Sequence, residues 1–133
     1  MALLVPNGIE GEILKYVLNI TAPENLSIRL YTNNITPAET DTVGTYTEAT
    51  GGGYTSKPLV PGSWVITLNN PAAQATHPQI VWTFTGVVGN VYGYFVTRDT
   101  SNDLMWSERF TNGPYNVQNN GDEVKVTPRS SLE

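Results

Sequence analysis

The single histidine is the first residue to test for chemistry, because histidine is the usual acid–base group near neutral pH. His77 precedes Pro78 at the start of an expected strand, and we expect it to be an exposed loop residue. One histidine and no cysteine cannot build a His- or Cys-rich metal site, and HExxH and GxSxG patterns are absent. We therefore expect a protein that is no enzyme and that holds no metal or cofactor.

Two pairs of carboxylates lie close together in the sequence, Asp99 with Asp103 and Asp122 with Glu123. Both pairs fall in expected turns, where aspartate is favoured because it hydrogen-bonds to the local backbone. Neither has the ligand spacing of an EF-hand loop, although a weak surface calcium site stays open as an alternative. The run at 51–53 (Gly-Gly-Gly) lacks the flanking features of a phosphate-binding loop, so we interpret it as a hairpin loop.

Aromatic residues are the other candidates, because tyrosine and tryptophan rings suit interfaces and can stack on sugars. Trp64, Trp82 and Trp106 alternate in step with aliphatic neighbours, which predicts that they point into the core. Tyr92 and Tyr94 lie on the strand face opposite Val91 and Phe95, and we expect them on the surface as interface candidates.

Composition narrows the class of partner. The 133 residues are enough for one core, and the absence of cysteine fits folding in a reducing cytoplasm. A net charge of -5 without a basic cluster disfavours nucleic-acid binding. No apolar run approaches the roughly 20 residues of a membrane span. We therefore expect no membrane partner. The N-terminal residues 1–6 carry no basic region and no long apolar run, so we expect that they are not a signal peptide.

The elements that must position these residues are one helix followed by strands. Apolar residues at helical spacing predict a helix over residues 8–19, with Asn7 and Glu10 as a capping box and Pro23 beyond its end. These apolar positions are Ile9, Ile13, Leu14, Val17 and Leu18. From Pro23 onward the pattern alternates in twos. Strands are expected at 26–31, 64–68, 80–85, 91–98, 104–110 and 124–126, with weaker ones at 45–49 and 54–59.

Seven to eight strands without intervening helices predict a mainly β fold. We expect an antiparallel β-sandwich, jelly-roll-like, with the N-terminal helix over one edge or end. A small closed barrel is the alternative. The expected organisation is a single domain over residues 1–131, with residues 132–133 a cloning scar.

Several different short turn and strand motifs are distributed over most of the chain. They are residues 1–6 (Met-Ala-Leu-Leu-Val-Pro), Asn33-Asn34, Thr36-Pro37, 46–51 (Tyr-Thr-Glu-Ala-Thr-Gly), 84–86 (Phe-Thr-Gly), 91–94 (Val-Tyr-Gly-Tyr) and 119–122 (Asn-Asn-Gly-Asp). In these motifs the chain resembles small virion structural proteins of tailed bacteriophages, particularly those of aquatic hosts. The resemblance implies a protein made in the host cytoplasm and located in the virion. It supplies no catalytic residue, because the motifs are structural.

Two functions follow from that resemblance. The first is a head-decoration (cement) protein that binds the capsid as a homo-oligomer, a trimer before a dimer, with residues 1–19 contributing contacts. Its candidate interface residues are Leu3, Leu4, Val5, Tyr92 and Tyr94. The alternative is a tail-fibre or lectin-like adsorption module that binds host-surface carbohydrate, and a cellular carbohydrate-binding module is a third reading. Decoration predicts exposed apolar surface, whereas a lectin predicts a shallow groove with an exposed aromatic and amide or carboxylate side chains.

Overall fold

The computed structural model describes residues 4–68 and 72–132. In these residues the chain forms one α-helix, two short 3-10 helices and eleven strands. Their bounds are α1 Asn7–Val17, β1 Leu26–Tyr31, η1 Val43–Thr45, β2 Lys57–Leu59, η2 Pro61–Ser63, β3 Val65–Leu68, β4 Ala73–Thr76, β5 Ile80–Thr83, β6 Gly89–Val91, β7 Gly93–Arg98, β8 Leu104–Arg109, β9 Tyr115–Val117, β10 Glu123–Val126 and β11 Arg129–Leu132.

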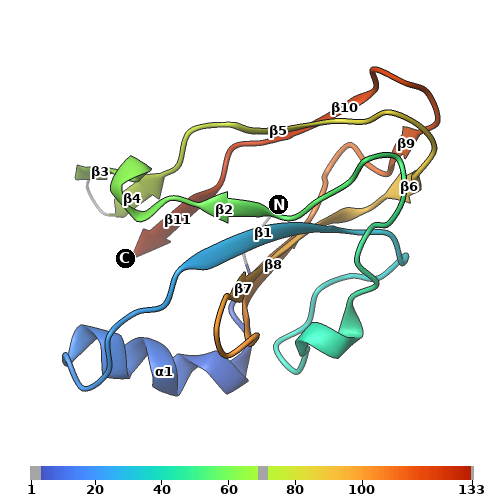
Figure 1. The fold of residues 1–133 in the computed structure, drawn as a ribbon. Helices are drawn as coiled ribbons and strands as arrows, with labels where there is room; N and C mark the ends of the chain where they lie inside the picture. The colour runs from blue at the N-terminus through green and yellow to red at the C-terminus, as the bar shows by residue number, and fades with distance from the viewer. Residues whose placement is uncertain (1–3, 69–71, 133) are drawn as a thin grey trace.

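The strands pair in four antiparallel groups. The largest is a four-stranded sheet in the order β2-β1-β7-β8, and β11-β4-β3 form a three-stranded sheet. The pairs β5–β10 and β6–β9 complete the set. In Figure 1, α1 lies below the four-stranded sheet, β5 and β10 run above it, and the three-stranded sheet extends to one end. The predicted mainly β, antiparallel fold with an N-terminal helix is therefore confirmed, with more strands than expected.

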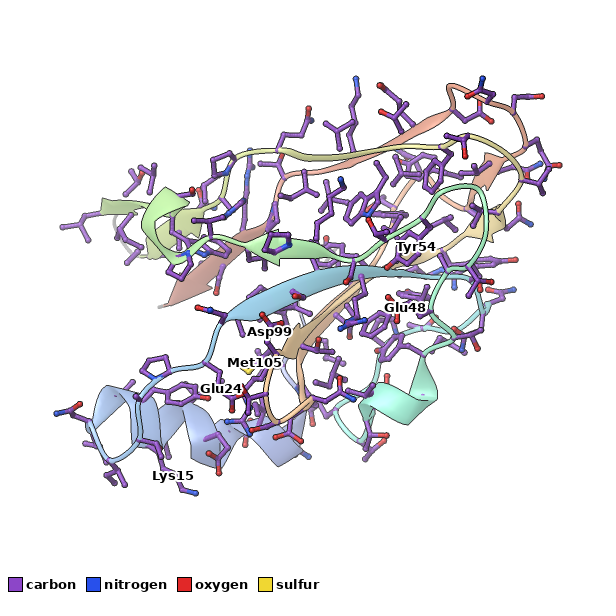
Figure 2. All side chains as sticks on the ribbon, viewed as in Figure 1. Lys15, Glu24, Glu48, Tyr54, Asp99 and Met105 are labelled. Atoms are coloured by element: carbon purple, nitrogen blue, oxygen red, sulfur yellow. The ribbon has the colours of Figure 1, made fainter. Side chains whose placement is uncertain are left out.

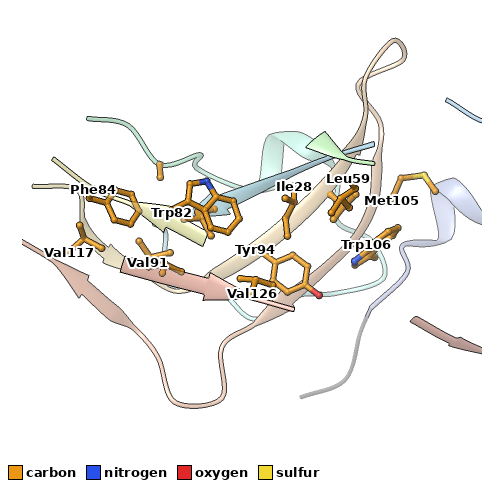
Figure 3. Packing of buried hydrophobic residues seen from close by; sticks show 14 of the residues in the cluster. Ile28, Leu59, Trp82, Phe84, Val91, Tyr94, Met105, Trp106, Val117 and Val126 are labelled. Carbon is orange, nitrogen blue, oxygen red and sulfur yellow. The ribbon is translucent and has the colours of Figure 1, made fainter. Parts of the chain in front are cut away.

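The main core lies between β1 and β7 on one side and β5 and β10 on the other (Figure 3). Trp82 and Phe84 are nearly inaccessible and pack with Val91, Val117 and Val124. Since Trp106 is also buried, the prediction of a core position is confirmed for two tryptophans.

A second, smaller cluster covers the other face of β7. It consists of Tyr31, Tyr46, Phe95 and Leu104. The rings of Tyr46 and Phe95 stack with centroids 5.1 Å apart. Because β7 has buried side chains on both faces, Tyr94 is also buried. The prediction that Tyr94 lies on the surface is wrong for this reason.

The three-stranded sheet departs from the expected pattern. All four residues of β3 are exposed, so the predicted core positions of Ile66 and Leu68 are wrong. Alternation predicted a strand here correctly, but no element among the described residues covers either face of it. Trp64, just before β3, is half-buried against His77 and Trp106, at ring-centroid distances of 5.2 Å and 6.5 Å.

The prediction that His77 is an exposed loop residue is wrong, because only 4% of its surface is exposed. Its ring packs edge-on against Trp64, and its Nδ1 atom lies 2.8 Å from the carbonyl oxygen of Pro78. The loop that was expected to expose it is instead covered by the segment before β11, whose Pro128 carbonyl accepts the His77 backbone N–H.

The weakly predicted strand at 45–49 is replaced by η1 and an isolated bridge between Glu48 and Tyr31. Glu48 accepts hydrogen bonds from the Arg29 guanidinium at 3.0 Å and from the Tyr54 hydroxyl at 2.9 Å. Figure 2 shows Glu48 and Tyr54 side by side above η1. Two backbone hydrogen bonds, from the Ala49 N–H to the Leu30 carbonyl and from the Thr32 N–H to the Thr47 carbonyl at 2.9 Å each, hold this segment beside β1 together with the side-chain contacts. They are fewer than the continuous ladder that a strand would make.

The predicted helix is confirmed, with different ends. It begins at Asn7 after Pro6, so Asn7 lies inside the helix and no side chain caps it. Only Ile9 of its apolar residues is fully buried, whereas Leu14, Val17 and Leu18 are exposed. At the other end of the chain, the backbone of Leu132 pairs with Ala73 in β11, and Glu133 lies outside the described residues.

Candidate functional site

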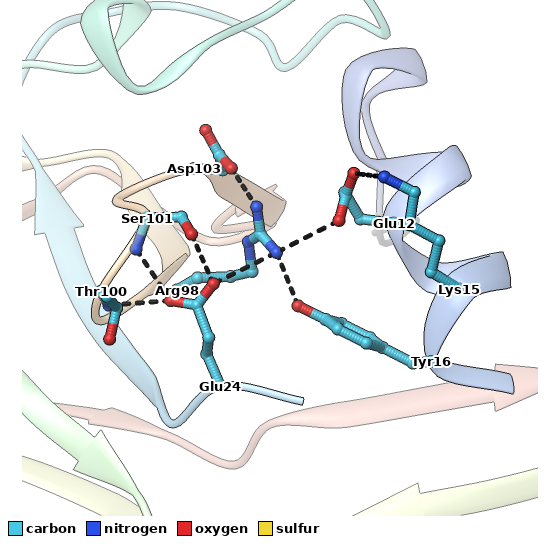
Figure 4. Close-up of polar contacts among 8 residues, drawn as sticks. All are labelled: Glu12, Lys15, Tyr16, Glu24, Arg98, Thr100, Ser101 and Asp103. Atoms are coloured by element: carbon cyan, nitrogen blue, oxygen red, sulfur yellow. Dashed lines mark hydrogen bonds and ion pairs between the residues drawn. The ribbon is translucent and has the colours of Figure 1, made fainter. Parts of the chain in front are cut away.

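Arg98 is the centre of the densest polar cluster (Figure 4). Its side chain, at the end of β7, is 8% exposed and donates to the Tyr16 hydroxyl at 2.7 Å and to the Asp103 carboxylate. Carboxylate oxygens of Glu24 and Glu12 lie 3.2 Å and 3.6 Å from its Nη1 atom. The cluster thus joins α1, the segment before β1 and the β7–β8 hairpin.

The charged side chains of this cluster are paired with one another. Burial alone would lower the pKa of Arg98, but its hydrogen bonds to Asp103 and Tyr16 outweigh burial and raise the pKa, so the guanidinium stays charged. Glu24 accepts the Ser101 hydroxyl and the N–H groups of Ser101 and Thr100, and these bonds lower its pKa. We assign the cluster a structural role, since its strongest donors and acceptors already bind one another.

An open hollow of about 350 Å³ adjoins this cluster between α1, η1 and the hairpin. It contains the carboxylates of Glu12, Asp41 and Asp103 beside one guanidinium. Asp41 is engaged by the Tyr46 hydroxyl at 2.7 Å. Within residues 4–68 and 72–132, no three His, Cys, Asp or Glu side chains are placed to hold a metal ion. The hollow therefore carries no assigned ligand.

A second hollow, of about 280 Å³, lies between β8, β10 and the segment leading into β9. We call it the Tyr115 hollow. Tyr115 is 40% exposed, and its ring packs against Phe110 with centroids 5.0 Å apart. The hollow is lined by Tyr94, Glu108, Phe110, Thr111, Asn112, Tyr115, Lys125, Val126 and Thr127.

The Tyr115 hollow combines aromatic rings with donors and acceptors. The Glu108 carboxylate accepts the Tyr94 hydroxyl at 2.8 Å, and burial together with this bond raises the pKa of Tyr94. Asn112, with its amide, and Lys125, with its ammonium, also line the hollow. Such a mixture suits a ligand with several hydroxyl groups over an apolar ring face, and the volume is near the lower limit of small-molecule sites, about 300 Å³.

Exposed aliphatic side chains form two patches. The α1 patch consists of Leu14, Val17, Leu18 and Ile20, at and beyond the end of the helix. The β3 patch consists of Val60, Val65, Ile66 and Leu68. These eight residues make up most of the large apolar side chains that the described residues expose; the others are Val87 and Tyr115. Large apolar side chains that are exposed in groups mark candidate interaction sites.

Most of the interface residues predicted from the sequence make contacts within their own chain. Leu4 exchanges backbone hydrogen bonds with Ser107 at 3.2 Å and 3.1 Å, and Val5 packs on the main core. Tyr92 is half-buried beneath the Arg109 guanidinium, 5.1 Å from its ring centroid. Leu3 lies outside the described residues. The structure does not bring these residues together with Tyr94 into one surface patch.

Sequence reasoning missed Tyr115 and the β3 patch. Tyr115 follows a Gly-Pro pair in a turn, which is a signal for exposure that alternation does not use. The β3 patch lies in an uncharged segment, since no Asp, Glu, Lys or Arg occurs between Lys57 and Arg98. Alternation predicts core positions for Ile66 and Leu68, so it does not single out this patch.

Comparison with protein-family models, with curated proteins and with solved structures gave no match. Among the helical residues that the structure describes, no helix has the length and apolarity to cross a membrane.

Proposed function

We propose that this protein is a non-enzymatic virion structural protein of a tailed bacteriophage, a head-decoration protein that binds the capsid as an oligomer. The observation that carries the proposal is the pair of exposed aliphatic patches, α1 and β3. A monomer that acted alone in water would gain nothing from exposing eight large aliphatic side chains in two groups.

The proposed architecture is a β-sandwich. Its two layers are the four-stranded sheet and the β5–β10 pair, and the support for them is the shared core of Trp82, Tyr94 and Val124. A compact sandwich with patches at separate places suits a protein that contacts both a shell and its own copies. We propose that the α1 patch contacts the shell.

The test is binding to capsids that lack the protein. Purified protein should co-sediment with such capsids in near-stoichiometric amounts and raise their resistance to heat. Leu14→Lys should reduce the bound fraction, because it places a charge in the α1 patch where 61% of the side chain is exposed. Val87→Lys, at a position 60% exposed outside both patches, is the matched control. Wild-type protein that stays in the supernatant would refute the decoration role.

A second candidate function, carbohydrate adsorption, is favoured by the Tyr115 hollow, which has the exposed aromatic, amide and carboxylate groups expected of a lectin. A glycan array probed with the same preparation separates the two. A hit abolished by Tyr115→Ala and retained by Val87→Lys, with no binding to capsids, would transfer the assignment to an adsorption module. Because Tyr94 is buried, Tyr115 is the informative position.

A further inference from the structure

Strand β3 has an open edge. It pairs with β4 in the register Val65↔Thr76 to Leu68↔Ala73, and with no other strand in the described residues. Its outer backbone N–H and C=O groups therefore have no ladder partner there. Such an edge pairs readily with another extended strand unless charge, proline or a bulge blocks it. Residues 65–68 (Val-Ile-Thr-Leu) contain no charge and no proline, and the β3–β4 pairing shows no bulge.

Both faces of β3 are also exposed. Val65 and Ile66 are each 63% exposed, and Leu68 is 84% exposed, although they point to different faces of the sheet. An ordinary edge strand buries one face on its own core. A strand that offers two apolar faces and a free edge is complementary to a second strand of the same kind.

Charge identifies the partner. The chain carries a net charge of -5, so two copies repel each other at most approaches. Residues 58–97 contain no Asp, Glu, Lys or Arg, and β3 and β4 lie within that segment. The α1 patch, by contrast, shares its helix with Glu10, Glu12 and Lys15. The β3 edge is thus where two acidic copies meet without placing like charges opposite each other.

We propose that two copies of this chain pair their β3 strands antiparallel about a twofold axis, which joins two three-stranded sheets into one of six strands. With the axis at Thr67, each Ile66 lies opposite Leu68 of the partner subunit on the same face of the joined sheet, so the contact is self-complementary and closes at two copies.

The inference deepens the proposed function, since it names the occupant of the β3 patch while the α1 patch stays free for the shell. It also revises the expected trimer, because a twofold edge contact produces a dimer.

The first test is oligomeric state by light scattering and sedimentation velocity at tens of micromolar protein. Wild-type protein should be dimeric, and Ile66→Lys should be monomeric, because a lysine on an edge strand opposes strand addition. Val87→Lys is the matched control, at 60% exposure against 63%, and should remain dimeric. Unchanged circular dichroism and thermal transitions would show that Ile66→Lys is folded. A monomeric wild type, or a dimeric Ile66→Lys, would overturn the proposal.

The second test measures the geometry. The chain has no cysteine, so Ser131→Cys, at an exposed position of β11, accepts a single spin label. Edge pairing separates the two labelled backbones by five strand spacings, about 24 Å at about 4.8 Å each. A dimer whose labels lie far outside that distance would use another surface. Capsid binding by Ile66→Lys separates this proposal from the proposed function. If the monomeric variant still binds capsids, the decoration role is retained. The loss of dimers in this variant confirms only the β3 contact.

Discussion

At the scale of single residues, the second cluster contains two buried tyrosines in unlike states. The Tyr46 hydroxyl is 2.7 Å from both the Asp41 carboxylate and the Ser107 hydroxyl. The Tyr31 hydroxyl is buried and has no hydrogen-bond partner in the part of the chain described. Burial raises the pKa of Tyr31 to about 12, so the group stays neutral at physiological pH. The centroids of the two rings are 4.9 Å apart, but we expect the two hydroxyl groups to contribute differently to stability.

Replacing each of these tyrosines by phenylalanine tests that difference. Tyr31→Phe removes an unpaired hydroxyl, so the free energy of unfolding should stay the same or rise by up to about 1 kcal/mol. Tyr46→Phe deprives Ser107 and Asp41 of a partner and should lower it by about 1–3 kcal/mol. Urea denaturation measures both, and each variant controls for the other. Equal losses would mean that the Tyr31 hydroxyl has a partner after all.

At the scale of elements, β7 depends on a glycine. Gly93 lies between Tyr31 on β1 and Arg109 on β8 in the sheet register. A Cβ atom added to Gly93 would approach the Glu108 carbonyl oxygen to 2.1 Å and the Tyr31 ring to 2.6 Å. The aromatic ring therefore lies across the bare backbone of the central strand, and the pairing of β1, β7 and β8 requires glycine here.

Gly93→Ala should consequently be severe. The backbone oxygen of Glu108 cannot move without breaking the β7–β8 ladder, so we expect a loss of about 3 kcal/mol or failure to fold, at or above the upper end for overpacking. Gly11→Ala is the matched control, since a Cβ atom at Gly11 meets nothing within 4 Å and helix propensity favours alanine by about 1 kcal/mol. Thermal unfolding of both variants checks this, and a mild effect at position 93 would contradict the packing.

At the scale of the whole molecule, two separate loops depend on ionised carboxylates. Glu24 accepts N–H groups of the β7–β8 hairpin, and Asp122 accepts the N–H groups of Gln118 and Asn119 at 2.9 Å each. Hydrogen bonds lower the pKa of both carboxyls, led by the Ser101 hydroxyl for Glu24 and the Gln118 N–H for Asp122. The anionic forms are the ones that the fold stabilises.

Stability should therefore depend on pH in the acid range. A group whose pKa is lower in the folded state stabilises above its unfolded pKa, 4.5 for Glu24 and 3.8 for Asp122, and this stabilisation is lost as the pH falls through the folded value. Glu24→Gln and Asp122→Asn should flatten the fall of the thermal midpoint below about pH 4.5. Glu39→Gln, on an exposed residue, is the control. An unchanged slope in the double variant would contradict this origin.

The local pattern of this sequence was sufficient to predict its helix and its longer strands. Alternation along residues 26–31 and 104–110 and the turn residues between β7 and β8 depend only on neighbours in the chain, and the observed strands and hairpin follow them. The helix α1 and the burial of Trp82 and Trp106 could be predicted from the sequence for the same reason. Period and turn chemistry are local properties, so they can be read without the fold.

Only the tertiary structure decided which faces of those elements are covered. Alternation distinguishes two faces of a strand, but burial depends on whether a distant segment packs there. β7 has clusters on both faces, so Tyr94 is buried, whereas β3 has cover on neither, so Ile66 and Leu68 are exposed. The Tyr115 hollow likewise joins β8, the start of β9 and β10, which meet only through the fold. Coverage is a long-range property. For that reason the sequence by itself determined the helix and the longer strands, and the packing determined which of their faces are buried.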